Sequence, residues 1–266
     1  MAGSVGSATA PLVRSILSVG LDWNLDRPKG YIWLVQSDIY SDGRYLALNP
    51  SYHAEDSAWK AARISEMLKF YQLQPVSVVE VGCGAGEVLV QLQRQFPSAN
   101  RLEGWDVSPH AIALAAKRAT TVVRFHHGDF LAEARDAFDL ALCIDVFEHV
   151  EDYIGFIRRL RSTAKWKIFH IPLDISVQSV IRVRPITRER ERVGHLHHFT
   201  KETALETLGV AGYEIAGWSM TAGALDLPDK SVLQRLARVP RRVCRALQPD
   251  LAARWLGGFS LLVLAR

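Results

Sequence analysis

Cysteine is scarce in this chain of 266 residues, and long apolar runs are absent. The three cysteines, Cys83, Cys143 and Cys244, are widely spaced, which argues against a disulfide framework and a cysteine-based metal site. They indicate a reducing compartment, and we expect a cytoplasmic protein. No apolar stretch approaches the ~20 residues of a transmembrane helix, and the start of the chain lacks the pattern of a signal peptide.

A strong excess of one charge is also missing. The formal net charge is +4 and 48% of the residues are hydrophobic, which is an ordinary globular balance. Internal repeats and low-complexity segments are absent. The length suits one large domain, or a domain with additions.

After residue 75 the pattern alternates between β-branched runs and amphipathic stretches. We expect helices at 55–71, 87–96, 109–118, 153–162 and 200–208, and strands at 76–81, 101–106, 122–126, 139–144, 166–171, 213–219 and 259–265. Pro172 is expected to end the fifth strand. Such alternation predicts an α/β fold with a Rossmann-like sheet covered by helices on both faces, and ligands at the carboxyl ends of the strands.

Two segments lie outside this pattern. Residues 1–55 form an N-terminal extension, interpreted as a lid, and 56–266 form the main domain. A basic helical insertion at 222–257 precedes the last strand, and its stretch 235–245 has five arginines and no acid. This insertion could cap the sheet edge, contact a membrane surface or bind a partner. Pro240 argues against one long helix, and the absence of aromatics among the arginines makes nucleic acid an unfavoured partner.

The most informative motif is the run Val-Val-Glu-Val-Gly-Cys-Gly-Ala-Gly at 78–86. Gly82, Gly84 and Gly86 allow close approach of the backbone to a ligand at a helix start, and Cys83 is a small residue within the turn. A dinucleotide fingerprint needs its third glycine at position 87, where the chain has Glu87. Glu80 would repel a phosphate and attract an ammonium group.

Acidic residues follow the second and third strands. Asp106 lies 24 positions after Gly82, where an acid can accept hydrogen bonds from ribose hydroxyls. Gly128-Asp129-Phe130 follows the third strand, and 139–152 carries Asp145, Glu148 and His149. In order and spacing these motifs resemble the class I S-adenosylmethionine (SAM)-dependent methyltransferases, in the small-molecule branch that includes ubiquinone-pathway-like enzymes.

That resemblance implies a seven-stranded, mostly parallel sheet whose last strand pairs with the sixth as a hairpin. It implies SAM as cofactor, with its methionine end held by the turn, its ribose by Asp106 and its adenine by the segment after the third strand. The residues expected to bind it are Glu80, Gly82, Cys83, Gly84, Gly86, Asp106, Val107, Asp129, Phe130 and Asp145.

Three interpretations of Asp145, Glu148 and His149 stay open. A helix beginning at Asp145 would place all three on one face. His149 or His195 could act as a general base, with Asp145 as a further catalytic candidate. The set could instead hold a divalent cation with His195 or His197, which is similar to the metal set of small-RNA 2′-O-methyltransferases. The remaining interpretation is a set of hydrogen bonds that shapes the pocket floor.

The sequence therefore predicts methyl transfer from SAM to an unidentified small-molecule, glycan or lipid-type acceptor. One alternative is a metal-assisted 2′-O-methyltransferase acting on RNA or a polyhydroxylated acceptor, and another is a non-catalytic SAM-binding protein. We expect His170 to be a core histidine and Asp174 to meet the substrate. The arginine-rich stretch 182–192 could receive an anionic substrate or contact a membrane surface. The oligomeric state stays open.

Overall fold

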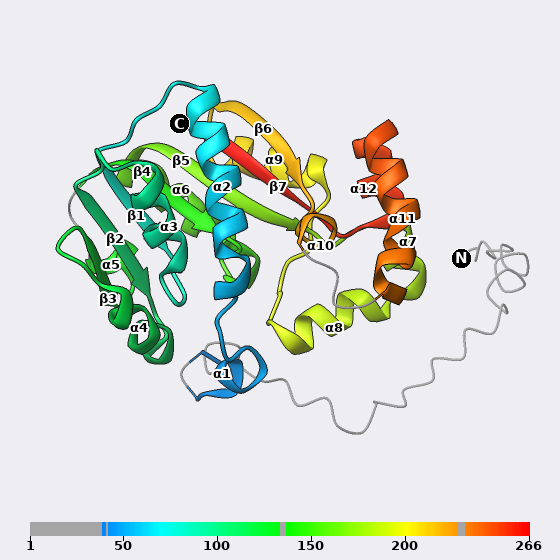
Figure 1. Cartoon of the computed structure of the whole chain (residues 1–266), viewed down its shortest axis with the longest axis horizontal. Coiled ribbons are helices and arrows are strands. Elements are labelled where there is room, and N and C mark those ends of the chain that lie inside the picture. The colour runs from blue at the N-terminus through cyan, green and yellow to red at the C-terminus, as the bar shows by residue number, and fades with distance from the viewer. Residues whose placement is uncertain (1–38, 41, 134–136, 228–231) are drawn as a thin grey trace, which may run out of the picture. The chain divides into compact units, whose positions relative to one another are not determined.

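The computed structural model describes residues 39–40, 42–133, 137–227 and 232–266 (Figure 1). The chain divides into two units, Met1–Val35 and Gln36–Arg266, and all the described residues lie in the second. No helix in this described part is long and apolar enough to cross a membrane.

One sheet of seven strands forms the centre of this unit, in the order β3-β2-β1-β4-β5-β7-β6. The strands are β1 Ser77–Val81, β2 Arg101–Asp106, β3 Val123–His127, β4 Phe138–Ile144, β5 Ala164–Leu173, β6 Ile215–Thr221 and β7 Phe259–Ala265. All neighbours pair in parallel except β7, which is antiparallel to both β5 and β6. The predicted Rossmann-like α/β fold is confirmed.

Helices surround this sheet. They are α1 Arg44–Leu48, α2 Ala54–Phe70, α3 Glu87–Gln95, α4 Pro109–Ala115, α5 Phe130–Glu133, α6 Tyr153–Leu160, α7 Val177–Arg182, α8 Arg184–Arg192, α9 Lys201–Val210, α10 Gly223–Asp226, α11 Val232–Leu247 and α12 Pro249–Leu256. Because strand residues alternate between faces, Val78 packs in a core with α2 and α3, whereas Val79 packs in a second core with α6 and α9.

Local signals in the sequence explain where several helices begin. The Ser108 side chain accepts a hydrogen bond from the Ala111 backbone N–H, and Pro109 follows as the first helical residue of α4. Thr200 caps α9 through a capping box with Thr203. Gly86 begins α3 with a left-handed backbone, at φ 77°.

Two prolines do not interrupt their elements. The expectation that Pro172 ends the fifth strand and the expectation that Pro240 prevents one long helix were both wrong. β5 continues through Pro172 to Leu173, because β7 pairs with it beyond the point where β4 ends, at the Ile144–His170 pair. The helix α11 runs through Pro240. It persists because contacts with neighbouring elements hold it: Arg241 donates to Gln178 of α7 and to the Leu256 carbonyl.

No helix begins at Asp145, so Asp145, Glu148 and His149 do not share one helix face. Asp145 has φ 54°, a left-handed backbone, and only the short 3₁₀ turn Phe147–His149 follows.

Gly209 lies inside α9, which ends at Val210, and a glycine this close to a helix end costs only about 1 kcal/mol.

Candidate active site

The glycine turn joins β1 to α3 at the carboxyl edge of the sheet. Gly82, Gly84 and Gly86 all have positive φ, at 73°, 53° and 77°. The backbone N–H groups of Gly82 and Cys83 donate to the Trp105 carbonyl of β2 at 2.8 and 3.0 Å. A side chain at Gly86 would place its Cβ 2.3 Å from the ring of Phe125. Neighbouring strands therefore hold the turn in one conformation.

Cys83 has a structural position within this turn. Its side chain is buried and packs against Gly104 of β2. Burial raises the pKa of the Cys83 thiol well above its usual value, so the thiol stays protonated. Cys83 can contribute its backbone to a ligand, but its sulfur is not a nucleophile.

Asp106 reaches back from the end of β2 to the turn. Its carboxylate accepts hydrogen bonds from the backbone N–H groups of Gly84, at 2.9 Å, and Ser108, at 2.8 Å. Burial raises the pKa of Asp106. Val107, the next residue, is 58% exposed, so an apolar surface lies beside this carboxylate. The arrangement fits the predicted binding of a ribose with an adenine beside it.

Glu80 is a buried carboxylate at the base of the turn. Its side chain is 2% exposed, and Oε2 has no hydrogen-bond partner among the described residues. Burial raises its pKa to about 8. An unpartnered buried acid favours a ligand that brings a cation or a hydrogen-bond donor, and the ammonium group of SAM would fit.

Lys60 of α2 is a site residue that the sequence did not reveal. Its ammonium lies 2.9 Å from an Asp145 oxygen and 3.2 Å from Asp56. Burial alone would lower its pKa, but the Asp145 and Asp56 carboxylates outweigh burial and raise it. The four-residue spacing of Asp56 and Lys60 on one helix was the available signal, and such pairs usually lie on a surface.

Asp145 belongs to a largely buried chain of polar groups. One of its oxygens lies 2.6 Å from Nδ1 of His170, and Nε2 of His170 lies 2.9 Å from the Thr221 hydroxyl. Burial opposes ionisation of Asp145, but the charges of His170 and Lys60 lower its pKa below the usual range. His170 is the predicted core histidine, with both ring nitrogens partnered.

The segment after β3 contains Asp129 and Phe130, which differ in their exposure. Asp129 is exposed, and its carboxylate accepts a hydrogen bond from the Leu131 backbone N–H at 2.9 Å. Phe130 is only 1% exposed and packs in the core against Trp105 and Phe138. The ring expected beside adenine therefore fills the core, while Asp129 remains accessible to a ligand.

Glu148 and His149 follow the end of β4 and carry unpartnered buried atoms. Both Glu148 carboxylate oxygens and Nδ1 of His149 have no hydrogen-bond partner among the described residues. Burial, followed by the charge of Asp145, raises the pKa of Glu148. Burial, followed by His195, lowers the pKa of His149 to about 4. His149 is therefore neutral at physiological pH.

His195 and His198 share one carboxylate beyond the end of β5. Nδ1 of His195 lies 2.6 Å from Oδ2 of Asp174, and Nδ1 of His198 lies 3.0 Å from the same oxygen. Burial opposes ionisation of Asp174, but these two hydrogen bonds lower its pKa to about 2. The ring centroids of His195 and His149 are 4.9 Å apart.

Two groups among the described residues bring ligand atoms within 4.8 Å of one another: Glu148, His149 and His195; and Asp174, His195 and His198. Asp145 is in neither group. His197 is directed elsewhere, with Nε2 3.0 Å from the Val150 carbonyl. Of the residues considered for a cation, the structure thus brings Glu148, His149 and His195 together and places Asp145 and His197 outside both groups.

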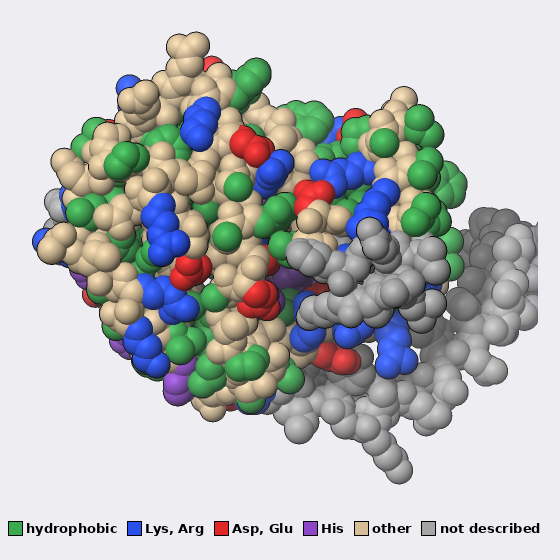
Figure 2. Space-filling model, viewed as in Figure 1, with side chains coloured by type: hydrophobic (Ala, Val, Ile, Leu, Met, Phe, Trp, Pro, Cys, Tyr) green, Lys and Arg blue, Asp and Glu red, His purple; other side chains and the backbone are tan. Residues whose placement is uncertain are grey.

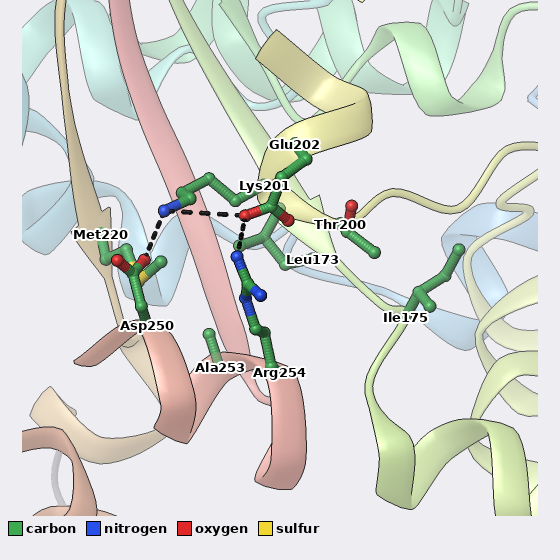
Figure 3. A pocket seen from close by; sticks show the side chains of 9 residues that line it. All are labelled: Leu173, Ile175, Thr200, Lys201, Glu202, Met220, Asp250, Ala253 and Arg254. Atoms are coloured by element: carbon green, nitrogen blue, oxygen red, sulfur yellow. Dashed lines mark hydrogen bonds and ion pairs between the residues drawn. The ribbon is translucent and has the colours of Figure 1, made fainter. Parts of the chain in front are cut away.

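A separate pocket lies between α9, α12 and the ends of β5 and β6 (Figure 3). Its charged residues pair with one another: Lys201 with Asp250 at 2.6 Å, and Glu202 with Arg254 at 2.5 Å. The pocket therefore joins α12 to α9 and leaves these charges satisfied.

Comparison with known proteins agrees with this geometry. Residues 52–216 match the model of a methyltransferase domain family. The chain is 28% identical over 151 residues to norajmaline N-methyltransferase of Rauvolfia serpentina, covering 52% of this chain and 51% of the relative. It is 29% identical over 116 residues to trans-aconitate 2-methyltransferase of Deinococcus radiodurans, covering 43% and 44%. The chain spans about half the length of these curated relatives.

A solved structure shares the fold across most of both chains. Magnesium protoporphyrin IX methyltransferase of Synechocystis, with bound S-adenosylhomocysteine, superposes with a TM-score of 0.55 at 17% identity, covering 87% of this chain and 97% of that one. This likeness shows the fold, and the family match, which spans the glycine turn and the β4 segment, confirms the resemblance to methyltransferases. The chain belongs to the methyltransferase-domain family, among the class I SAM-dependent methyltransferases.

Proposed function

We propose that this protein transfers a methyl group from SAM to a hydroxyl-bearing small molecule bound beside His149 and His195. The observation that carries the proposal is the Asp174–His195 pair, buried next to the Glu148 carboxylate and Nδ1 of His149, which have no hydrogen-bond partner among the described residues, at the same sheet edge as the glycine turn. The names of both curated relatives denote small-molecule methyltransferases, one of them an N-methyltransferase, so they support a small-molecule acceptor and do not bear on its hydroxyl group.

Asp174 fixes the tautomer of His195. An ionised carboxylate only accepts hydrogen bonds, so Nδ1 of His195 is the donor across the 2.6 Å contact. The neutral ring then has its lone pair on Nε2, which can take a proton from an acceptor hydroxyl. His198 donates to the same oxygen and helps to keep Asp174 in place.

SAM would supply an electrophilic methyl group on its sulfonium. The turn residues Gly82, Gly84 and Gly86 would hold its methionine end, Glu80 its ammonium group and Asp106 its ribose. Lys60 keeps one donor beyond its pairs with Asp56 and Asp145, and can meet the methionine carboxylate. The protein's main tasks are then to orient the two reactants and to exclude water.

The test is incubation of the full chain with labelled SAM and metabolite extracts, followed by mass spectrometry of labelled products. We expect His195→Ala to lower the rate at least about 100-fold, the usual contribution of a general base, while SAM affinity measured by calorimetry stays within about twofold. The matched control is His110→Ala, a histidine on α4. An unchanged rate in His195→Ala would refute the base assignment, and SAM binding without product in any extract would favour the non-catalytic alternative.

A divalent-cation site is a second candidate, favoured by the two unpartnered oxygens of Glu148 and Nδ1 of His149. Carboxylate and imidazole ligands suit Mg²⁺ or Mn²⁺, which would support a metal-assisted 2′-O-methyltransferase. Calorimetric titration with Mn²⁺ should then show binding that Glu148→Gln abolishes and Asp129→Asn preserves. Activity that survives EDTA, with no Mn²⁺ binding, would exclude this candidate and leave the base mechanism.

A further inference from the structure

The helix α11 exposes its apolar face. Val239, Val243 and Leu247 recur every four residues, so they lie along one side of the helix, with exposed fractions of 46%, 52% and 75%. On α12, Leu251 and Trp255 are again four residues apart and are 50% and 59% exposed. An amphipathic helix in a globular protein normally buries such a face.

Arg241 and Arg245 of α11 point the other way, toward the rest of the protein. Arg241 donates to Gln178 of α7 at 2.9 Å and to the Leu256 carbonyl at 3.2 Å. Arg245 forms an ion pair with Asp226 of α10, whose carboxylate also accepts a hydrogen bond from the Trp59 indole at 3.2 Å. These contacts fix the orientation of α11, so the exposed apolar side follows from the fold.

α12 is fixed in a similar way. Lys201 pairs with Asp250, Glu202 pairs with Arg254, and Ala253 is buried beneath them (Figure 3). Leu251 and Trp255 consequently face away from the core.

The short helix α7 packs against α12 and extends the apolar surface. Val180, Ile181 and Val183 are 55%, 77% and 58% exposed. The next helix, α8, carries a series of exposed arginines near this surface: Arg184, Arg188, Arg190 and Arg192. Figure 2 shows hydrophobic side chains along the outer margin of α11 and α12, with Lys and Arg side chains beside them.

We propose that α7, α11 and α12 form a surface that binds the interface of an anionic lipid bilayer. Valine, leucine, isoleucine and a tryptophan suit shallow burial at the boundary between headgroups and acyl chains. The arginines of α8 supply charge complementarity, since 182–192 holds five arginines against two glutamates. The binding is peripheral, because no described helix can span a membrane.

The experiment is flotation of the full chain with vesicles of phosphatidylcholine alone, or mixed with phosphatidylglycerol. We expect binding to the mixed vesicles that weakens as salt rises. Ile181→Asp and Trp255→Asp should each lower the partition coefficient about tenfold, by removing apolar burial. Phe70→Asp is the matched control, because Phe70 is 78% exposed at the end of α2, away from this surface.

The double variant Arg188→Gln with Arg190→Gln should reduce binding to the mixed vesicles. It should leave any binding to vesicles of phosphatidylcholine alone unchanged, because that binding depends on the apolar side chains. Binding that is equal for neutral and anionic vesicles would overturn the proposal. So would an absence of vesicle binding combined with a concentration-dependent dimer that Trp255→Asp dissociates, because the face would then be a contact between two copies. The readout is independent of methyl transfer, so its failure is distinguishable from failure of the proposed activity.

Discussion

Glu80 is a buried carboxylate in an unusual environment, since Oε2 has no hydrogen-bond partner among the described residues. Its pKa of about 8, raised by burial, exceeds the unfolded value of about 4.5. Between those two pH values the folded state keeps a proton that the unfolded state has lost, so the free energy of unfolding falls as pH rises. The same acid is the proposed partner of the SAM ammonium group, and thus stability is lowered where a ligand is expected to bind.

Glu80→Gln should flatten this pH dependence. We expect the variant to unfold at a higher temperature than the wild type at about pH 8. This difference in unfolding temperature should vanish near pH 4.5, where Glu80 begins to lose its proton in the unfolded state. Its SAM affinity at about pH 8 should fall about tenfold, since a charge-assisted hydrogen bond is lost. Thermal denaturation and calorimetry at the two pH values provide the measurement. Glu66→Gln, at an exposed position on α2, is the control, and parallel stability curves for Glu80→Gln and the wild type would refute the burial argument.

Asp106 offers a second test at this scale. Asp106→Ala frees the N–H groups of Gly84 and Ser108, so we expect a loss of about 1–3 kcal/mol in stability and of at least about 100-fold in SAM affinity. Asp139→Ala is a close match, because Asp139 accepts backbone hydrogen bonds from Val76 at 2.9 Å and Ser77 at 2.8 Å. Similar losses of stability in both variants, with SAM affinity lost only in Asp106→Ala, would support the ribose role. Unchanged SAM affinity in Asp106→Ala would reject it.

At the scale of helices and strands, the sequence is most informative where neighbouring residues determine where an element begins or ends. Ser108-Pro109 and Thr200 mark the starts of α4 and α9, and the expected last strand coincides with β7. The extents of β5 and α11 could not be predicted, because β7 and the arginine contacts extend them past Pro172 and Pro240.

The residues of the candidate site also differ in how well the sequence predicts them. Asp106 and the glycine turn follow from spacing along the chain. Lys60, in contrast, meets Asp145 across a long interval of sequence, and the left-handed backbone of Asp145 separates it from Glu148 and His149. Periodicity along the chain predicts neither the contact between Lys60 and Asp145 nor the left-handed backbone at Asp145.

Two glycines should respond oppositely to the same substitution. Gly86→Ala places a methyl 2.3 Å from Phe125 at φ 77°, so we expect at least about 2 kcal/mol of destabilisation. Gly209 is helical with no atom within 4 Å of its Cβ position, so Gly209→Ala should stabilise by about 0.5–1 kcal/mol. Denaturant titration measures both effects. Equal effects would show that backbone conformation does not govern the turn.

At the scale of the whole molecule, residues 39–40 and 42–53 contact two separate parts of the candidate site. Ser108 donates to the Tyr40 carbonyl at 2.9 Å, and its Oγ lies 2.9 Å from the Tyr52 hydroxyl. On the other side, Asn49 donates to the Arg192 carbonyl at 3.1 Å. The rings of Tyr40 and His149 meet edge to face with centroids 6.1 Å apart. This stretch of chain is therefore held at both Ser108 and Arg192, and its Tyr40 ring lies against His149.

Ser108→Ala should loosen this stretch of chain by removing its hydrogen bonds with Tyr40 and Tyr52. We expect faster proteolytic cleavage within 39–53 in the variant, and protection of the same bonds when SAM is added to the wild type. Thr200→Ala removes a comparable helix cap from α9, and it should leave cleavage at 39–53 unchanged. Limited proteolysis with mass spectrometry identifies the bonds. Equal cleavage of both variants would mean that the cap, rather than the link to Tyr40, is responsible.

The contact between Phe125 and Gly86 also constrains how this sequence can change over generations. Any side chain at position 86 meets the ring at 125, and Gly104 and Cys83 crowd the same ring and turn. A smaller residue at 125 would have to arise before position 86 could lose its glycine, whereas the reverse order passes through a protein with a broken turn. Among descendants of this chain, the residue at position 125 of β3 would therefore determine which residues position 86 of the turn can accept.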